Sequence, residues 1–167
     1  GAMCAWRGPR VAGGRGHARG LTAVSTGLKG ALTARDGIVS QNVAVHPNPV
    51  RASFFTRPPE GRPSSPPFRF VTVAGLNPRK DIGGLLEAFA QAFGASNGAS
   101  LTIVGEGPRR AALEPRARRL GVEDRVAFRG PQGRSGVRQA RWDAHAFVLP
   151  SRHGTFGGAP VEALATR

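Results

Sequence analysis

The chain has 167 residues, a formal net charge of +14 at pH 7 and 40% hydrophobic residues, enough for one domain of ordinary size with a hydrophobic core. It contains no apolar run of about 18 residues and no charged leader followed by an apolar stretch. We therefore expect a cytoplasmic protein with neither a membrane span nor a signal peptide. A single cysteine, Cys4, excludes an internal disulfide and has no companions at metal-ligand spacing.

The positive charge raises nucleic acid as a possible partner, because arginine side chains match phosphate oxygens. The 24 basic residues are nearly all arginine, and they are spread from Arg7 to Arg167 rather than gathered in one run. Aromatic residues make up only 7%, with no tyrosine, so stacking platforms for single strands are scarce. An arginine excess beside abundant alanine and glycine is also typical of a coding bias, and we do not expect nucleic acid as the partner.

The first part of the chain predicts a tail, a strand–helix–strand unit and a linker. Residues 1–20 are glycine-rich and basic, begin with a remnant of cloning, and predict a disordered tail. Residues 21–56 predict a strand from Leu21 to Val24, a helix capped by Ser25, and a second strand in "NVAVHPNPV". Residues 57–67, "RPPEGRPSSPP", contain five prolines in eleven residues and predict a linker, where we place a domain boundary.

Residues 68–167 predict a Rossmann-like α/β domain with a parallel sheet and helices on both faces. Apolar runs of strand type alternate with helical patterns four times along this segment. The predicted strands are "FRFVTVAG", "SLTIVG", "DRVAFRG" and "HAFVLP". The predicted helices are "DIGGLLEAFAQAFG", "PRRAALEPRARRLG" with an interruption at Pro115, "GVRQARWDA" and "GGAPVEALA".

The four loops after these strands share a character. They read "AGLNPRK", "GEGPR", "RGPQGR" and "PSRHGTFGG", and each contains glycine and a basic residue. Ligands of parallel α/β sheets bind beyond the carboxyl ends of the strands, where glycine lets the backbone approach closely and a cation faces the same edge. The last loop also leads through glycines into a helix, whose N-terminus favours phosphate. The loops together predict a phosphate-bearing ligand.

The segment from Phe68 to Ala165 resembles the C-terminal, nucleotide-sugar-binding domain of retaining glycosyltransferases of family 4, which have the two-domain GT-B fold. Three runs carry the resemblance: "AGLNPRKDIGGLLEAF", "LTIVGEGPRRAALEPRARRLGVEDRVAFRG" and "FVLPSRHGTFGGAPVEALA". The piece "AVSTGLKGAL…NVAVHPNPV" is similar to the end of the N-terminal domain and its crossing into the second domain. Residues 21–56 would then be a remnant of the N-terminal domain, and residues 68–167 a donor domain incomplete at its C-terminus.

The resemblance implies a role for two residues in the reaction. Lys80 matches the family lysine that holds the donor diphosphate, and Glu162 matches the second glutamate of the Glu-x7-Glu motif, which accepts hydrogen bonds from ribose hydroxyls. The alternatives without a role in binding are that Lys80 is an ordinary solvated surface lysine and that Glu162 only stabilises the first turn of its helix. Further donor contacts, many through the backbone, fall on Arg79, Gly105, Gly107, Arg129, Gly130, Pro131, His153, Thr155, Phe156, Gly157, Gly158 and Ala159.

The chain departs from the family pattern at three places. Gly75 stands where members often have an arginine, Gly154 stands at the first glutamate of Glu-x7-Glu, and Asn48-Pro49 replaces the usual Asn-Gly. In the family, the glutamate at the position of Gly154 approaches the transferred sugar. Its loss would therefore affect sugar selection and turnover more than nucleotide binding.

By resemblance, the chain is an enzyme domain that takes part in transfer from a nucleotide-diphosphate sugar to an unknown acceptor hydroxyl. The scheme requires no metal or other cofactor, and the sequence has no Asp-x-Asp motif. Two alternatives stay open: a catalytically inactive nucleotide-binding fragment, and a basic nucleic-acid-binding protein.

Overall fold

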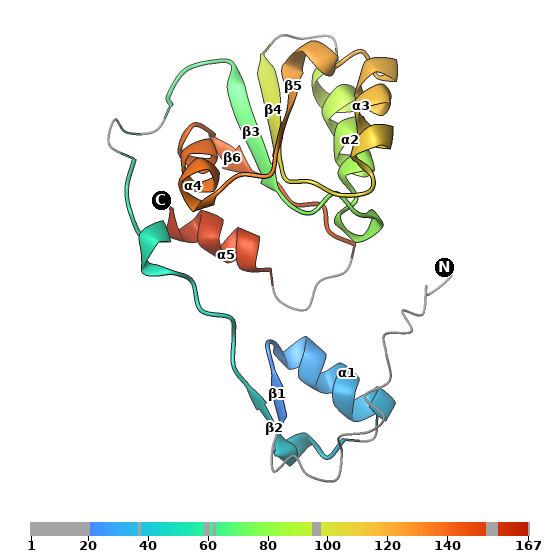
Figure 1. Cartoon of the computed structure of the whole chain (residues 1–167), viewed down its shortest axis with the longest axis vertical. Coiled ribbons are helices and arrows are strands. Elements are labelled where there is room, and N and C mark those ends of the chain that lie inside the picture. Colours follow the sequence, from blue (N-terminus) through green and yellow to red (C-terminus); the bar gives the residue numbers. More distant parts are fainter. Residues whose placement is uncertain are drawn as a thin grey trace. The chain divides into compact units, whose positions relative to one another are not determined.

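The computed structural model describes residues 21–36, 38–58, 61, 63–94, 98–152 and 157–166. The predicted tail at 1–20 lies outside them. The chain divides into two compact units between Asn48 and Pro49 (Figure 1). The sequence places the boundary later, at 57–67. Residues 52–54 belong to the second unit because Phe54 is buried there and the Ser53 carbonyl accepts a hydrogen bond from Arg138 Nη1 at 3.0 Å.

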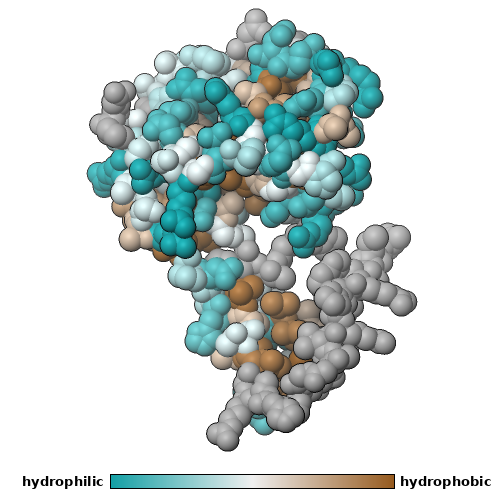
Figure 2. Space-filling view, in the orientation of Figure 1, coloured by the Kyte–Doolittle hydropathy of each residue, from teal (hydrophilic) through white to brown (hydrophobic). Residues whose placement is uncertain are grey.

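The first unit is a single β-α-β motif. Strand β1 (Leu21–Ala23) and strand β2 (Val43–Val45) pair in parallel and are connected by α1 (Thr26–Asp36). Ser25 caps the helix as predicted, because its Oγ accepts a hydrogen bond from Leu28 N at 3.1 Å. Figure 2 shows hydrophobic residues on the visible face of this unit, in agreement with the exposure of Leu21 and Val39.

The second unit is an α/β domain with a four-stranded parallel sheet in the order β5-β4-β3-β6. Its strands are β3 (Phe68–Val73), β4 (Ala99–Val104), β5 (Val126–Gly130) and β6 (Ala146–Phe147). Its helices are α2 (Ile82–Phe93), α3 (Arg110–Arg119), α4 (Arg134–Trp142) and α5 (Gly158–Ala165). The predicted parallel sheet is confirmed, while β6 is shorter than predicted and Pro115 lies within an unbroken α3.

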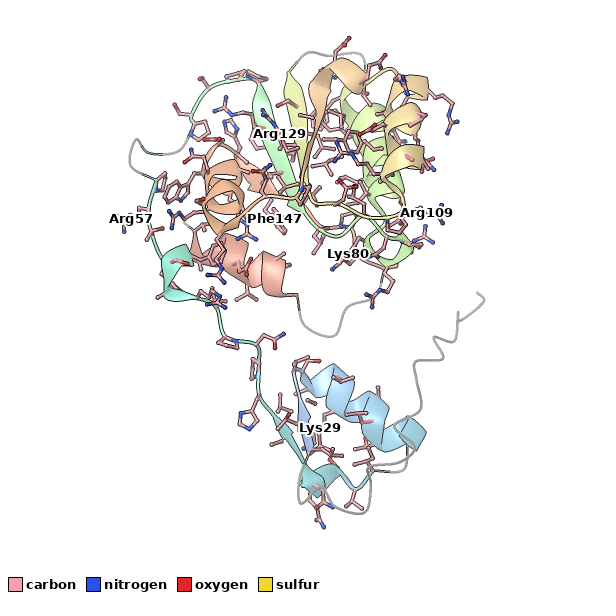
Figure 3. All side chains as sticks on the ribbon, viewed as in Figure 1. Lys29, Arg57, Lys80, Arg109, Arg129 and Phe147 are labelled. Atoms are coloured by element: carbon pink, nitrogen blue, oxygen red, sulfur yellow. The ribbon has the colours of Figure 1, made fainter. Side chains whose placement is uncertain are left out.

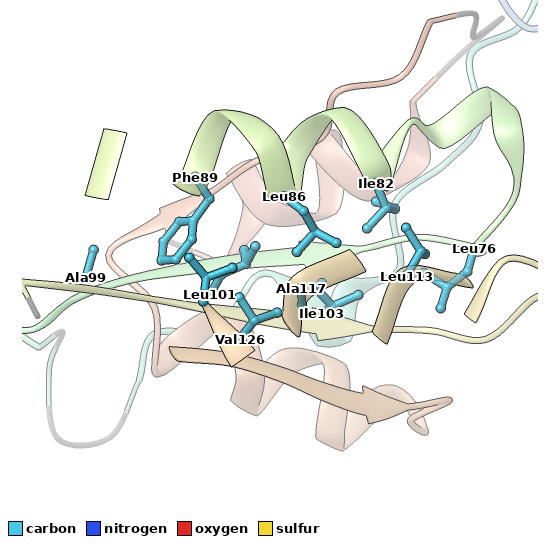
Figure 4. Packing of buried hydrophobic residues seen from close by; sticks show 11 residues of the cluster. Leu76, Ile82, Leu86, Phe89, Ala99, Leu101, Ile103, Leu113, Ala117 and Val126 are labelled. Atoms are coloured by element: carbon cyan, nitrogen blue, oxygen red, sulfur yellow. The ribbon is translucent and has the colours of Figure 1, made fainter. Parts of the chain in front are cut away.

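Two apolar clusters hold helices on opposite faces of this sheet. On one face, Leu86 of α2 and Leu113 of α3 pack with Leu101 of β4 in the larger cluster (Figure 4). On the other face, Val137 and Ala140 of α4 pack against Val71 and Val104. Figure 2 shows mainly hydrophilic residues over the visible surface of this unit.

One irregularity interrupts the pairing of β4 with β5. Ile103 pairs with Phe128, but the next residue of β4, Val104, pairs with Gly130. Arg129 is the extra residue of this bulge and is exposed. Bulges of this kind re-aim side chains at strand ends, and here the bulge lies where β5 enters its glycine-containing loop.

Leu86→Ala should lower the free energy of unfolding by about 3 kcal/mol, because it empties space in a close-packed cluster where Leu86 is 0% exposed. Leu164→Ala is the matched control, since Leu164 is 57% exposed and its truncation should change stability by less than about 0.5 kcal/mol. Urea unfolding followed by circular dichroism measures both. Equal effects of the two changes would contradict the assigned core.

Candidate functional site

The loops after β3, β4 and β5 are tied together by backbone hydrogen bonds at the carboxyl edge of the sheet. Ala74 N donates to Val104 O at 3.0 Å, and Gly105 N donates to Gly130 O at 2.8 Å. Leu76 N donates to Glu106 O at 2.9 Å. These bonds continue the ladder beyond the last paired residues, so the three glycine-containing loops lie side by side, as the parallel topology predicts.

Gly105 and Gly107 allow this close approach between loops. Gly105 has φ 138°, and a Cβ there would lie 1.9 Å from the Ala74 carbonyl oxygen. A Cβ on Gly107 would lie 2.6 Å from the Leu76 carbonyl oxygen. No side chain fits at such distances without moving the neighbouring backbone, so glycine at these two positions allows the loops after β3 and β4 to pack against each other.

Lys80 lies at the end of a short 3₁₀ turn, Pro78–Lys80, that follows β3. Asn77 Oδ1 begins the turn by accepting a hydrogen bond from Arg79 N at 3.1 Å. The Lys80 side chain is half-buried, and within the described part of the chain it has neither an ion-pair partner nor a hydrogen-bond partner. Its ammonium therefore offers three donors to a ligand at this edge, where Figure 3 also shows Arg109.

The loop after β6 is joined to the Lys80 turn by two contacts. Arg152 N donates to Arg79 O at 2.9 Å, and Arg152 Nε pairs with Asp81 Oδ2 at 2.7 Å. Asp81 is the first residue after the turn and has a left-handed backbone, φ 48° and ψ 40°, which costs about 1 kcal/mol for a residue other than glycine. The hydrogen bond from Arg152 holds the pKa of the Asp81 carboxyl below its ordinary value.

Arg110 neutralises the acidic residue of the β4 loop. It donates to Glu106 at 2.8 Å and to Glu114 at 2.9 Å, and its other Nη donates to the Phe128 carbonyl at 3.4 Å. The hydrogen bond from Arg110 lowers the pKa of Glu106 from its usual range. The negative charge of Glu106 is thus neutralised by Arg110. The other basic residues of this edge therefore give it a net positive charge.

Glu162 lies in the second turn of α5 and is held by a buried arginine. Arg141 Nη2 donates to Glu162 Oε2 at 2.8 Å and to Ala159 O at 3.3 Å. Gly157 precedes the helix and Gly158 begins it, at the position where free backbone N–H groups are expected. The pairing with Arg141 was not predicted from the sequence.

Several of the predicted site residues make no hydrogen bond or ion pair with the Lys80 side chain in the part of the chain that the structure describes. Arg129 and Pro131 are exposed, and Gly130 is buried under Arg110. The hollow of about 400 Å³ in this unit lies elsewhere, between α4, β6 and α5, and is lined by Arg141, Phe147 and Leu164. His153, Thr155 and Phe156, together with the departure at Gly154, lie outside the described residues.

Sequence reasoning missed three side chains that hold predicted site residues, namely Asp81 and Arg152 beside the Lys80 turn and Arg141 beside Glu162. Val137 and Arg141 are four residues apart and therefore share one face of α4, and this spacing is the signal that Arg141 is turned inward. Asp81 directly before a helix is typical of an N-cap, yet its side chain makes no capping hydrogen bond and pairs with Arg152 instead.

A parallel sheet covered on both faces, with glycine-rich cationic loops at its carboxyl edge, is the Rossmann-like architecture from which GT-B glycosyltransferases are built. The profile of the family described as Glycosyl transferases group 1 matches residues 55–167, and the chain belongs to this family. The match covers nearly all of the second unit and begins just after the buried Phe54.

The chain is also similar to named relatives and solved structures. Lipopolysaccharide 1,6-galactosyltransferase of Salmonella typhimurium is 30% identical over 144 residues, which are 85% of this chain and 38% of the relative. The apo structure of the lipopolysaccharide outer core galactosyltransferase WaaB has a TM-score of 0.68 at 27% identity, covering 89% of this chain and 41% of that one. Anabaena HepE in complex with UDP-glucose has a TM-score of 0.74 at 21% identity, covering 89% and 43%. The chain thus spans about two fifths of these proteins.

Glu162→Gln should lower the free energy of unfolding by about 2 kcal/mol, because it leaves the buried Arg141 charge without its carboxylate, an effect moderated by the 33% exposure of the Glu162 side chain. Glu87→Gln is the control, because the Glu87–Arg116 pair is exposed on both sides and should contribute less than about 1 kcal/mol. Urea denaturation at pH 7 compares the two. A larger loss in the control would refute the importance of the buried pair.

Asp81→Asn should reduce the dependence of stability on acid pH. The folded-state pKa of Asp81 is lowered from its ordinary value of 3.8, so its contribution is present above that value and is lost as the pH falls through the folded-state pKa. The difference between the unfolding midpoints of the two proteins should therefore be constant well above pH 3.8 and should shrink as the pH is lowered further. A constant difference at every pH would mean that the carboxylate charge is not what stabilises this contact.

Proposed function

We propose that residues 49–167 form the donor-binding part of a retaining glycosyltransferase that transfers a sugar from a nucleotide-diphosphate sugar to an acceptor hydroxyl. The observation that carries the proposal is the half-buried Lys80, which has no partner among the described residues and lies at the edge where three glycine-containing loops meet. A diphosphate supplies the negative charge that this edge lacks.

The relatives support a nucleotide sugar as the ligand. The Salmonella relative and WaaB are named as galactosyltransferases, and HepE has been seen with UDP-glucose. Because the chain covers less than half of each, we infer for it only the donor side of such a reaction. The acceptor and the identity of the sugar are left open.

Each site residue has a role in this scheme. As the bond between the anomeric carbon and the diphosphate oxygen breaks, Lys80 and Arg79 stabilise the negative charge that grows on the leaving diphosphate. The backbone N–H groups at Gly157, Gly158 and Ala159 act in the same way from the start of α5. The acceptor oxygen bonds to the anomeric carbon on the same face, and its proton passes to an oxygen of the leaving diphosphate. The scheme needs no metal.

Other donor contacts follow the loops. Gly105 and Gly107 form the floor, while Arg129, Gly130 and Pro131 lie along the base and Glu162 accepts from ribose hydroxyls. We also propose donor contacts for three residues of the loop before α5, namely His153, Thr155 and Phe156. A cytoplasmic location also stays a proposal; among the described helices, none is long and apolar enough to cross a membrane.

Calorimetric titration of the chain with UDP, GDP and ADP, at low and moderate salt, tests the donor site. We expect saturable binding of one nucleotide that survives the added salt. Lys80→Ala should weaken that binding by about 1 to 3 kcal/mol, the range for a charge-assisted contact. Lys29→Ala is the control, because Lys29 is the only other lysine and belongs to the first unit.

Three results would lead elsewhere. Unchanged affinity in Lys80→Ala removes Lys80 from the site. Equal, weak binding of all three nucleotides that salt abolishes means that the loops only display positive charge, as a nucleic-acid-binding protein also would. Nucleotide binding without hydrolysis of any donor sugar favours the inactive nucleotide-binding fragment.

A further inference from the structure

Arg141 is the most buried charged side chain among the described residues, with 4% of the residue exposed. A guanidinium keeps its charge at every physiological pH, and moving it out of water costs several kcal/mol unless partners compensate for the loss. The apolar residues around it, Val137 and Ala140 of α4 and Ala144 just after the helix, are all small. An arginine at this position therefore needs a reason beyond packing.

The contacts of Arg141 come from three other elements. Its Nη2 is bonded to Glu162 and to the Ala159 carbonyl, both in α5. Its guanidinium carbon lies 5.1 Å from the ring centre of Phe54 and 5.7 Å from that of Phe147, which is labelled in Figure 3. These aromatic faces favour a cation and hold the guanidinium plane in place.

The charge compensation of Arg141 depends mainly on Glu162. Arg141 Nε and Nη1 have no hydrogen-bond partner in the described part of the chain, and Glu162 supplies the one carboxylate bonded to the guanidinium there. A pair of this kind adds little stability over apolar residues of similar size, so stability alone does not account for it. Its specific effect is to fix where the carboxylate of Glu162 points.

Only one oxygen of Glu162 is used by this pair. Arg141 bonds to Oε2, while Oε1 accepts no hydrogen bond from the described residues and the side chain is 33% exposed. An ionised carboxylate accepts about four hydrogen bonds over its two oxygens. A Glu162 side chain anchored by Oε2 therefore presents Oε1 in a fixed direction to a ligand.

We propose that Arg141 is a positioning residue, which holds Glu162 so that its free oxygen accepts hydrogen bonds from the ribose hydroxyls of the donor nucleotide. The inference rests on the proposed function, in which Glu162 contacts the ribose. Arg141 itself does not touch the nucleotide. Its contribution is to remove the rotational freedom that Glu162 would otherwise lose on binding.

The test compares each of UDP, GDP and ADP with its 2′,3′-dideoxy counterpart, which lacks both ribose hydroxyls. The ratio of the two affinities measures hydroxyl recognition and is insensitive to a general loss of folded protein. In Arg141→Met we expect this ratio to fall about tenfold for the nucleotide that binds, with the dideoxy affinity unchanged. Arg141→Lys keeps the charge and should recover part of the ratio.

Arg138→Met is the matched control. Arg138 lies on the same helix and contacts Ser53 and Trp142, but it makes no hydrogen bond or ion pair with Glu162. Its replacement should leave the ratio as in the wild type. If Arg141→Met lowers the affinity for the nucleotide and for its dideoxy counterpart equally, or leaves both unchanged, the ratio does not move. That result would show that Arg141 only supports the fold and would overturn the proposal.

A double variant guards against a single variant that does not fold. Arg141→Met combined with Glu162→Gln removes both charges and leaves no buried ion unpaired. Its ratio should equal that of Glu162→Gln alone, because Arg141 acts only through Glu162. A further fall in the double variant would overturn the proposal. A wild-type chain that binds no nucleotide refutes the donor site itself, whereas a binding chain with an unmoved ratio refutes only the role of Arg141.

Discussion

The parallel register of β3, β4 and β5 is the constraint on which the site depends. Val73 pairs with Val104, and Val104 pairs with Gly130, so the three strands end at the same level. Each then continues into a loop that is bonded to its neighbour through backbone atoms. Because such bonds need no particular side chain, the loops keep their places while their side chains are left for a ligand.

The cations of this edge differ in how far the protein itself uses them. Arg110 neutralises Glu106 of the β4 loop, Arg152 neutralises Asp81 beside the Lys80 turn, and Arg141 is buried against α5. Lys80 has no such partner among the described residues. A high net charge thus does not by itself identify a binding surface. The cations available to a ligand are those that are not already paired with a carboxylate of the protein.

Much of the fold could be predicted from the sequence, since alternating strand and helix patterns restrict a chain of this length to a parallel sheet. The loops could be predicted as well, because their glycines and cations are local features. The contacts that hold Arg141 inward could not, because they include Phe54 and Glu162, which lie 87 and 21 residues away in the sequence. The left-handed Asp81 escaped prediction for a similar reason: Arg152, which stabilises its carboxylate, lies 71 residues away.

The bulge at Arg129 shifts the pairing by one residue just before β5 ends at Gly130. Side chains alternate between the two faces of a strand, so one additional residue exchanges the faces for all later positions. Gly130, with φ 66°, is the residue at which this exchange is absorbed. Without the additional residue, Arg129 and not a glycine would be the position that pairs with Val104. The bulge thus places a residue without a side chain at the end of the ladder, where Gly105 N donates to Gly130 O and the loops after β4 and β5 come together.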